Sequence, residues 1–308
     1  MTRFIYILLL ILPCNAWGQR VVFSPQWSAQ AQFAGYYVAK VKDFYKEAGL
    51  DVEIIHPTQT RNSIDMLNSG ECDFITLSLL SALSEKIVNS PIVNIMQSSQ
   101  TTGLTIISHN PLNNDLKNLE GKRIGKWKVG LSALAVTTLN NEGVSVDWID
   151  HMSGEEVFLS GAVDATLAMS YNELLSCLET GHKLDKSEII YLNELGHNIP
   201  EDGLYCLDTM DKDTSKRFVE ASKRGWQWAY ENRDETIDIV MDMLRNDKLP
   251  INRVHQKAML DEILRLQKNA RGERTMVLTP EDFERAIEIL SQDQNKPQRL
   301  DFKSFIRE

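Results

Sequence analysis

The sequence predicts an α/β fold with two lobes, and three patterns lead to this prediction. Segments typical of strands alternate with segments typical of helices from residue 20 to residue 107, which is the order of a parallel sheet with crossover helices. A second series with the same order runs from residue 123 to residue 180. The last third reads as helices alone, so it cannot form a third sheet and is expected to pack on the first lobe.

The first series begins with a β-like run at residues 20–23, which a turn ends. Apolar residues then recur at spacings of three and four over residues 33–48, which predicts one amphipathic helix ended by Gly49. The remaining elements of this series are predicted as strands at residues 50–56, 73–76, 93–96 and 104–107, and as helices at residues 61–68 and 79–88.

The second series shows the same alternation, and glycines end its helices. Its predicted elements are strands at residues 123–125, 144–149 and 163–169, and helices at residues 131–142, 154–160 and 171–180. The helices of the last third are predicted at residues 212–232, 235–245, 252–268 and 280–291. The final helix has a clear start, because Thr279 can cap it and Pro280 suits its first turn.

The first residues indicate export. Arg3 precedes an apolar run over residues 4–12, and Ala16 and Gly18 offer small residues at the two positions that a signal peptidase reads. The run is too short to hold the chain in a bilayer. We therefore predict a signal peptide over residues 1–18 and a periplasmic, exported mature chain. Lipid anchoring at Cys14 stays an alternative, although the small residues that normally precede such a cysteine are missing.

The order of the two series and the helical tail predicts how the mature chain is divided. Residues 19–104 would form the first part of lobe 1, residues 105–200 would form lobe 2, and residues 201–308 would return to lobe 1. Ligands of open α/β sheets bind at the carboxyl ends of the strands, and two lobes joined by paired crossings close over such a ligand by hinge motion. The loops expected to line this cleft are residues 24–32, 76–78, 99–102, 127–132 and 169–173.

Composition limits the classes of partner and of chemistry. The formal net charge of −10 argues against a nucleic-acid partner, which needs a basic surface. The sequence holds no GxSxG, HExxH or CxxC motif, so we expect no hydrolase chemistry, no metal and no cofactor. Cys72, Cys177 and Cys206 remain after cleavage, and their odd number leaves at least one thiol free. Whether Cys177 and Cys206 pair stays open.

Residues 27–40, WSAQAQFAGYYVAK, and residues 44–50, FYKEAGL, carry a family resemblance. They are similar to the thiamine-pyrimidine-precursor branch of exported solute-binding proteins. The same superfamily holds the nitrate, sulfonate and taurine binders and the eukaryotic thiamine pyrimidine synthase. Less specific matches continue the resemblance over most of the mature chain, at residues 70–73 (GECD), 119–125 (LEGKRIG), 161–165 (GAVDA), 171–173 (YNE) and 200–205 (PEDGLY).

The resemblance implies a type II periplasmic-binding-protein-like fold that holds a small planar ligand in the interlobe cleft. The chain would then be the substrate-binding protein of an ABC importer, with a membrane permease as partner and no enzymatic activity. In the pyrimidine branch, aromatic rings stack on the ligand and a carboxylate accepts hydrogen bonds from its exocyclic amine. Trp27, Tyr36 and Tyr37 match the aromatic positions, and Glu173 of the run Tyr171-Asn172-Glu173 matches the carboxylate.

The residues themselves suit such a ligand, with plainer alternatives. Gln30 and Gln32 can each donate and accept at a ring edge, and Ser78 lies at a strand end that should face the cleft. Tyr36 and Tyr37 lie on the predicted amphipathic helix, where one of them is more typical of the core than of a ligand site. Glu173 could equally be an acidic residue that stabilises the first turn of its helix.

Three other functions stay open. A sulfonate, taurine or nitrate ion could bind the loop at residues 126–132 through backbone N–H groups at the following helix start. The protein could instead signal by docking on a membrane receptor, and in either role a monomer is expected. The synthase branch is the enzymatic alternative, and there the resemblance implies a lysine that holds pyridoxal phosphate and a histidine that is consumed. Residues 73–85 contain neither residue type before Lys86, so we expect a non-enzyme.

Overall fold

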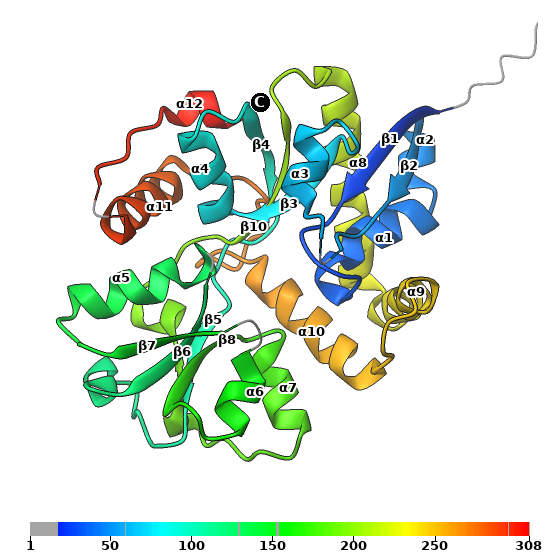
Figure 1. The fold of residues 1–308 in the computed structure, drawn as a ribbon. Coiled ribbons are helices and arrows are strands. Elements are labelled where there is room, and N and C mark those ends of the chain that lie inside the picture. Colours follow the sequence, from blue (N-terminus) through cyan, green and yellow to red (C-terminus); the bar gives the residue numbers. More distant parts are fainter. Residues whose placement is uncertain (1–17, 59, 129, 152–153, 295, 308) are drawn as a thin grey trace, which may run out of the picture.

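The computed structural model describes residues 18–58, 60–128, 130–151, 154–294 and 296–307. The expected signal peptide, with Cys14, lies outside these ranges apart from Gly18. Two five-stranded sheets form two lobes (Figure 1), so the α/β prediction is confirmed. None of the helices in the described ranges combines the length and apolar character that a membrane span needs.

The first lobe contains the sheet with strand order β2-β1-β3-β10-β4. Its strands are β1 (Gln19–Ser24), β2 (Leu50–Ile54), β3 (Phe74–Ser78), β4 (Ile92–Gln97) and β10 (Asp202–Leu207). β1 pairs in parallel with β2 and β3, whereas β10 runs antiparallel between β3 and β4. Its helices are η1 (Ala31–Phe33), α1 (Ala34–Val41), α2 (Phe44–Glu47), α3 (Ser63–Asn68) and α4 (Leu79–Ile87).

The second lobe contains the sheet with strand order β7-β6-β8-β5-β9, in which β5 runs antiparallel to β8 and β9. Its strands are β5 (Leu104–Ser108), β6 (Arg123–Trp127), β7 (Asp147–His151), β8 (Ala165–Met169) and β9 (Ile189–Tyr191). Its helices are η2 (Leu116–Leu119), η3 (Gly130–Ser132), α5 (Ala133–Asn141), α6 (Gly154–Leu159), α7 (Glu173–Glu179), η4 (Lys186–Glu188) and η5 (Leu192–Leu195).

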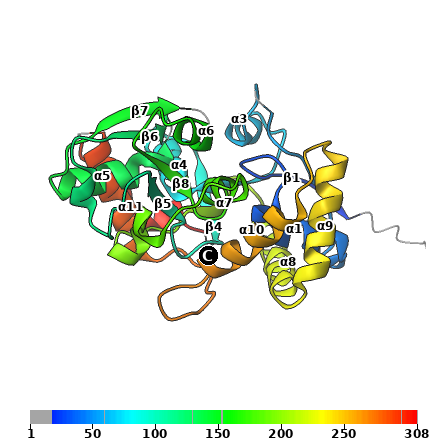
Figure 2. The same ribbon diagram turned by 90° about the horizontal axis from the view of Figure 1, so that it is seen from below.

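The last third differs in part from its prediction. The expected helices are α8 (Lys212–Glu231), α9 (Arg233–Asn246), α10 (Arg253–Leu266) and α11 (Pro280–Asp293), followed by the short α12 (Phe302–Phe305). α8 and α9 pack on α1, as expected, but α10 contacts α9 and also α7, and α11 contacts α4 and also α5. Figure 2 shows α10 extending from the first lobe towards α7. The last two long helices therefore bridge the lobes.

The single helix expected over residues 33–48 is broken in two. α1 ends at Val41, and Asp43 has a backbone φ of 59°, which lies in the left-handed region and cannot continue a right-handed helix. α2 then begins at Phe44. The apolar spacing predicted the buried face in part: Tyr36, Tyr37 and Tyr45 are buried, whereas Val41, at the end of α1, is 54% exposed. It could not reveal the turn between the two helices.

Two chain segments connect the sheets: residues 98–103 lead from β4 to β5, and residues 192–201 lead from β9 to β10. Glu201 ties them together. Its carboxylate accepts hydrogen bonds from Thr102 Oγ1 at 2.5 Å and from the Gly103 backbone N–H at 3.1 Å, while its own N–H donates to Ser99 Oγ at 2.6 Å. Each segment thus fixes the other at the junction of the lobes.

The three cysteines left in the expected mature chain are free and buried. Cys177 lies in α7 of the second lobe and Cys206 in β10 of the first, and neither forms a disulfide with the other. Burial raises the pKa of the Cys206 thiol to about 12, and that of the Cys177 thiol to about 11. Both therefore act as small apolar side chains in the core.

Glu201 predicts a measurable pH dependence of stability. Burial raises the pKa of its carboxyl to about 7, well above the value in an unfolded chain. Between roughly pH 4.5 and pH 7 the native state therefore keeps a proton that the unfolded state has lost, so the free energy of unfolding falls as the pH rises, by about 3 kcal/mol in all. Glu201→Gln keeps the shape of the protonated acid and removes this loss.

We expect Glu201→Gln to unfold at the same temperature as the wild type near pH 4.5 and several degrees higher at pH 8. Thermal scans across that range measure the difference. The control is Glu284→Gln, since Glu284 is exposed on α11. Parallel curves for Glu201→Gln and the wild type would show that the Glu201 carboxyl titrates normally.

Candidate functional site

The carboxyl ends of the strands in both sheets turn towards the junction between the lobes. In the first lobe β1, β3 and β4 end at Ser24, Ser78 and Gln97, and the antiparallel β10 begins beside them at Asp202. In the second lobe β8 ends at Met169, where the antiparallel β5 begins. The two connecting segments, residues 98–103 and 192–201, leave the sheets at these strand ends. The strand-end loops of both lobes therefore meet at the junction of the lobes.

The two lobes touch at this junction. Gln32 Nε2 of the first lobe lies 3.4 Å from the Tyr171 hydroxyl of the second. A cavity of only about 10 Å³ is left between Ser78 to Leu80, Leu131 and Leu134, and residues 199–201. Such a volume holds no more than about one water molecule. A ligand larger than a water molecule would not fit this cavity unless the residues around it moved.

Asp202 is the centre of a hydrogen-bond network at the junction. Its Oδ1 accepts from Gln26 Nε2 at 2.8 Å, and its Oδ2 accepts from Gln32 Nε2 at 2.7 Å. Gln30 Nε2 in turn donates to Gln32 Oε1 at 2.6 Å. An ionised carboxylate can only accept, so the two amides must turn their NH2 groups towards it. The network keeps further acceptor capacity at the carboxylate and at the amide oxygens of Gln26 and Gln30, and the second N–H of each of these two amides is a donor.

Negative charge gathers at this junction. Burial raises the pKa of the carboxyl groups of Asp202, Glu201 and Glu173, and these three acids also act on the Tyr171 hydroxyl, whose pKa burial raises in the first place. Within the described residues none of the three acids forms a salt bridge. A buried carboxylate held by neutral donors alone remains a strong acceptor for a cation or an N–H donor.

Trp27 is the large aromatic side chain that this edge exposes. It follows Gln26 in the loop after β1, and 61% of its surface is accessible. The backbone around it is held on two sides: Gln26 N–H donates to Thr76 Oγ1 at 2.9 Å, and the Trp27 carbonyl accepts from His56 Nδ1 at 2.7 Å. An exposed ring on a fixed backbone is suited to stacking on a flat ligand.

The structure places the other predicted site residues differently. Tyr36 is 1% exposed and packs against Phe23 and Trp226, with ring centroids 4.7 and 5.7 Å away. Tyr37 is fully buried, and its hydroxyl lies 3.1 Å from His56 Nε2. Both rings are thus buried between α1 and its neighbours, whereas the plainer interpretation assigned only one of them to the core. Burial, and to a smaller extent the charge of Asp202, raises the pKa of the Tyr36 hydroxyl, so this hydroxyl lies near the junction.

Ser78, Asn172 and Glu173 lie at helix starts. Ser78 is buried and caps α4, because its Oγ accepts from the Ser81 backbone N–H at 3.2 Å. The Glu173 carboxylate accepts from the Met169 backbone N–H at 2.9 Å and from Asn172 Nδ2 at 3.0 Å. Glu173 is partly buried and its contacts are local to the start of α7. Their role towards a ligand stays a prediction.

Hydrogen bonds bring the predicted residues Gln30, Gln32 and Tyr171 together, and their role towards a ligand stays a prediction. Sequence reasoning missed Gln26 and Asp202. Asp202 was visible only as part of the run PEDGLY at residues 200–205, whose strand was not predicted. Antiparallel pairing of β10 with β3 sets Asp202 opposite Ser78, at the edge where the parallel strands end. That placement depends on contacts between distant parts of the chain.

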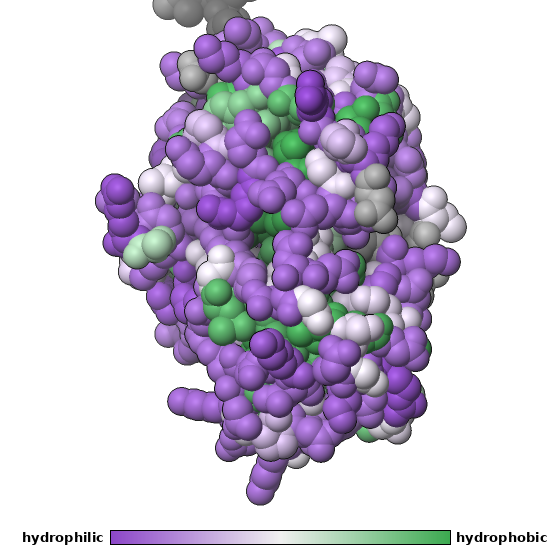
Figure 3. Space-filling view, turned by 90° about the vertical axis from the view of Figure 1, so that its left-hand side faces the viewer, coloured by the Kyte–Doolittle hydropathy of each residue, from purple (hydrophilic) through white to green (hydrophobic). Residues whose placement is uncertain are grey.

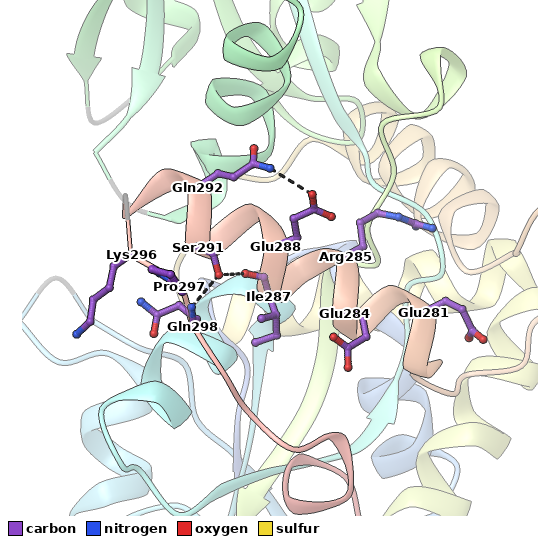
Figure 4. A pocket seen from close by; sticks show the side chains of 10 residues that line it. All are labelled: Glu281, Glu284, Arg285, Ile287, Glu288, Ser291, Gln292, Lys296, Pro297 and Gln298. Atoms are coloured by element: carbon purple, nitrogen blue, oxygen red, sulfur yellow. Dashed lines mark hydrogen bonds between the residues drawn. The ribbon is translucent and has the colours of Figure 1, made fainter.

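A second depression, with a volume of about 720 Å³, lies on the outer side of α11 (Figure 4). Its side chains come from α11 and the residues that follow, and they include Glu281, Glu284 and Glu288 at helical spacing. Figure 3 shows that this side of the molecule is mainly hydrophilic, with apolar side chains in small separate groups. No strand end contributes to this depression, so we take it as solvated helix surface.

The described residues contain no group of three or more His, Cys, Asp or Glu side chains placed to hold a metal ion. The candidate site is therefore described by hydrogen bonding, charge and stacking. The site combines amide and carboxylate groups from the first lobe with a phenol from the second, and the exposed Trp27 follows Gln26 in the same loop.

Solved structures of binding proteins share this fold. The chain superposes on the periplasmic aliphatic sulphonate-binding protein SsuA from Escherichia coli with a TM-score of 0.66, at 12% identity, covering 94% of this chain and 92% of that one. The ligand-binding component of an ABC-type import system from Staphylococcus aureus gives 0.68 at 11% identity, over 94% of this chain and 96% of that one. A desulfurization enzyme, DszB, also matches, with 0.61 at 12% identity over 94% and 96% of the two chains. At these identities the likeness concerns the fold.

The curated relatives are enzymes by name. The 4-amino-5-hydroxymethyl-2-methylpyrimidine phosphate synthase of Aspergillus parasiticus is 27% identical over 108 residues, which are 34% of this chain and 32% of that protein. The Schizosaccharomyces pombe synthase is 26% identical over the same length, 34% of this chain and 31% of that protein. The match thus spans about a third of the length of these relatives. Residues 30–236, two thirds of the chain, match the sequence profile of one family, and the chain therefore belongs to the NMT1/THI5-like family.

Proposed function

We propose that this protein is the exported substrate-binding component of an ABC importer and that its ligand is an aminopyrimidine related to the thiamine precursor. The family, the two-lobed fold and the import-system proteins among the structural relatives support the binding role. The observation that carries the ligand class is the acceptor network around Asp202. Its oxygens suit a ligand that offers N–H donors.

The geometry favours an amine over an anion. A sulfonate or nitrate ion at Asp202 would meet a carboxylate and amide oxygens in a site shielded from water, where like charges repel strongly. An amino or amidine group would instead form charge-assisted hydrogen bonds there, worth about 1.5–3 kcal/mol each. Trp27 offers the flat surface on which a pyrimidine ring stacks, for about 0.5–1.5 kcal/mol beyond the area it buries.

Two further functions stay candidates. The sulfonate-binding proteins among the structural relatives favour an organic anion, which the loop before η3 would have to hold away from Asp202. The synthases among the curated relatives favour an enzyme. The residues from β3 to the middle of α4 carry no lysine and no histidine before Lys86, so this segment lacks the side chain that would hold pyridoxal phosphate. We therefore propose binding and transport.

A thermal-shift screen of residues 19–308 tests the ligand class. The panel holds hydroxymethyl- and formamido-aminopyrimidines, thiamine, taurine, an alkanesulfonate and nitrate. We expect an aminopyrimidine to raise the melting temperature, because a ligand at a hundredfold excess over its Kd stabilises the folded state by about 2.7 kcal/mol. A shift with taurine, the sulfonate or nitrate and none with an aminopyrimidine would overturn the ligand class and keep the binding role.

Substitution of the two carboxylates tests which one receives the ligand. We expect Asp202→Asn to weaken aminopyrimidine binding more than tenfold, since the asparagine NH2 would face a glutamine NH2 and the ligand would lose a charged acceptor. Glu173→Gln weakens binding more than tenfold if Glu173 receives the exocyclic amine, and leaves it unchanged if Asp202 alone does. Isothermal titration calorimetry measures both.

The matched control is Asp73→Asn. Asp73 lies beside β3 at the opposite edge of the same sheet, where its carboxylate accepts from the Val22 backbone N–H at 2.7 Å. This variant should bind as the wild type does. If Asp202→Asn also binds normally while the wild type responds to an aminopyrimidine, Asp202 is structural and the acceptor network does not select the ligand.

A further inference from the structure

We propose that Tyr37 and His56 are positioning residues that hold Trp27 in place for ligand stacking, an inference that rests on the proposed function. Trp27 follows β1 and His56 follows β2, and these two strands are parallel neighbours. Tyr37 comes from α1, which packs on α8 and α9. The three residues form one chain of hydrogen bonds that runs from the core to the exposed indole: the Tyr37 hydroxyl, the His56 ring and the Trp27 carbonyl.

The direction of each hydrogen bond follows from chemistry. The Trp27 carbonyl can only accept, so His56 Nδ1, at 2.7 Å, must carry the proton. In a neutral imidazole the other nitrogen is then an acceptor, so the Tyr37 hydroxyl donates to His56 Nε2, at 3.1 Å. Burial lowers the pKa of His56, which keeps the ring neutral at pH 7. One tautomer therefore satisfies all three groups.

The surroundings of His56 leave its ring little freedom. Its side chain is only 9% exposed, and the rings of Phe33 and Tyr37 lie against it with centroids 6.2 and 5.9 Å away. Tyr37 is fully buried. A phenylalanine would fill the space of Tyr37 without a hydroxyl to satisfy, whereas the tyrosine hydroxyl has two polar neighbours, the His56 ring and the Gln30 backbone of the Trp27 loop. The other hydrogen bond of His56 goes to the backbone carbonyl of Trp27, the residue proposed to stack on the ligand.

Asp247 is the charged group that faces this relay. Its Oδ2 lies 3.9 Å from His56 Nε2, from the end of α9. When His56 takes up a proton at low pH, Nε2 becomes a donor and turns to Asp247 or to the Tyr37 oxygen, and the Tyr37 hydroxyl loses its acceptor. The relay is therefore intact above the pKa of His56 and broken below it, while the bond from Nδ1 to Trp27 remains.

Tyr45 offers a matched control for the relay. It is also a buried tyrosine of the segment after η1, and its hydroxyl donates to Ser222 Oγ at 2.9 Å, since that Oγ itself donates to the Phe218 carbonyl. Loss of either tyrosine hydroxyl removes one buried hydrogen bond and should lower stability by a similar amount. Only the loss at Tyr37 touches the Trp27 loop.

The experiment compares Tyr37→Phe, His56→Phe and Tyr45→Phe in the mature chain. Hydrogen exchange of the peptide covering residues 25–30 and the Kd for the best aminopyrimidine of the thermal-shift panel are measured at pH 7.5. We expect Tyr37→Phe and His56→Phe to speed exchange in that peptide and to raise the Kd at least fivefold, whereas Tyr45→Phe leaves both unchanged.

Each other result is decisive. Equal exchange and equal Kd in Tyr37→Phe and Tyr45→Phe would show that Tyr37 merely fills the core. Faster exchange with an unchanged Kd would show that the relay holds the loop but that Trp27 does not stack on the ligand. If no panel compound binds the wild type, the proposed function fails, and the exchange comparison alone then confirms or refutes the hold on the loop.

Discussion

The antiparallel pairing of β10 between β3 and β4 is the constraint on which the junction depends. The chain leaves the first sheet after β4, builds the second lobe, and must return into the middle of the first sheet rather than to its edge. This return fixes the second connecting segment beside the first, where Glu201 joins them. It also brings Asp202, at the first position of β10, to the ends of strands that run the opposite way.

Three carboxyl groups are buried at this junction, although burial disfavours their charged form. Three acids are removed from water without a basic partner in the described residues, and each responds with a raised carboxyl pKa. A core built for stability alone would replace such groups with apolar side chains, since an unpaired buried charge is costly. A ligand that supplies N–H donors would offset the free-energy cost of burying these carboxylates. The amides of Gln26 and Gln32 fix the orientation of the Asp202 carboxylate before such a ligand binds.

Local patterns in the sequence predicted much of the fold. Apolar spacing and glycine stops located α3, α4, α7 and the long helices of the last third, because amphipathic faces and caps are properties of neighbouring residues. β10 escaped prediction because a six-residue run, DGLYCL, has no period of its own and becomes a strand only by pairing with β3 and β4. The break at Asp43 depends on one backbone angle that no apolar pattern encodes.

The site was predictable to a smaller extent. The chemistry of their side chains drew attention to Gln30 and Gln32, and the resemblance to Tyr171. The three are joined by hydrogen bonds, since all lie in strand-end loops or beside them. Gln32 and Asp202 are 170 positions apart, so only the folded chain shows that they touch. Tyr36 and Tyr37 illustrate the opposite case. Their periodicity placed them on a helix, but the side of that helix they occupy is decided by Trp226 and His56, which local spacing does not reveal.

The two bridging helices affect how readily the empty protein changes shape. Parting the lobes requires α11 to separate from α5 and α10 from α7, along with the hydrogen bond from Asn252 Nδ2 to Glu179 at 2.8 Å. These contacts add to the free energy that separation of the lobes costs. A ligand that enters only when the lobes part would bind with an apparent affinity reduced by the fractional population of the open form, so the bridging helices would set how tightly scarce solutes are captured.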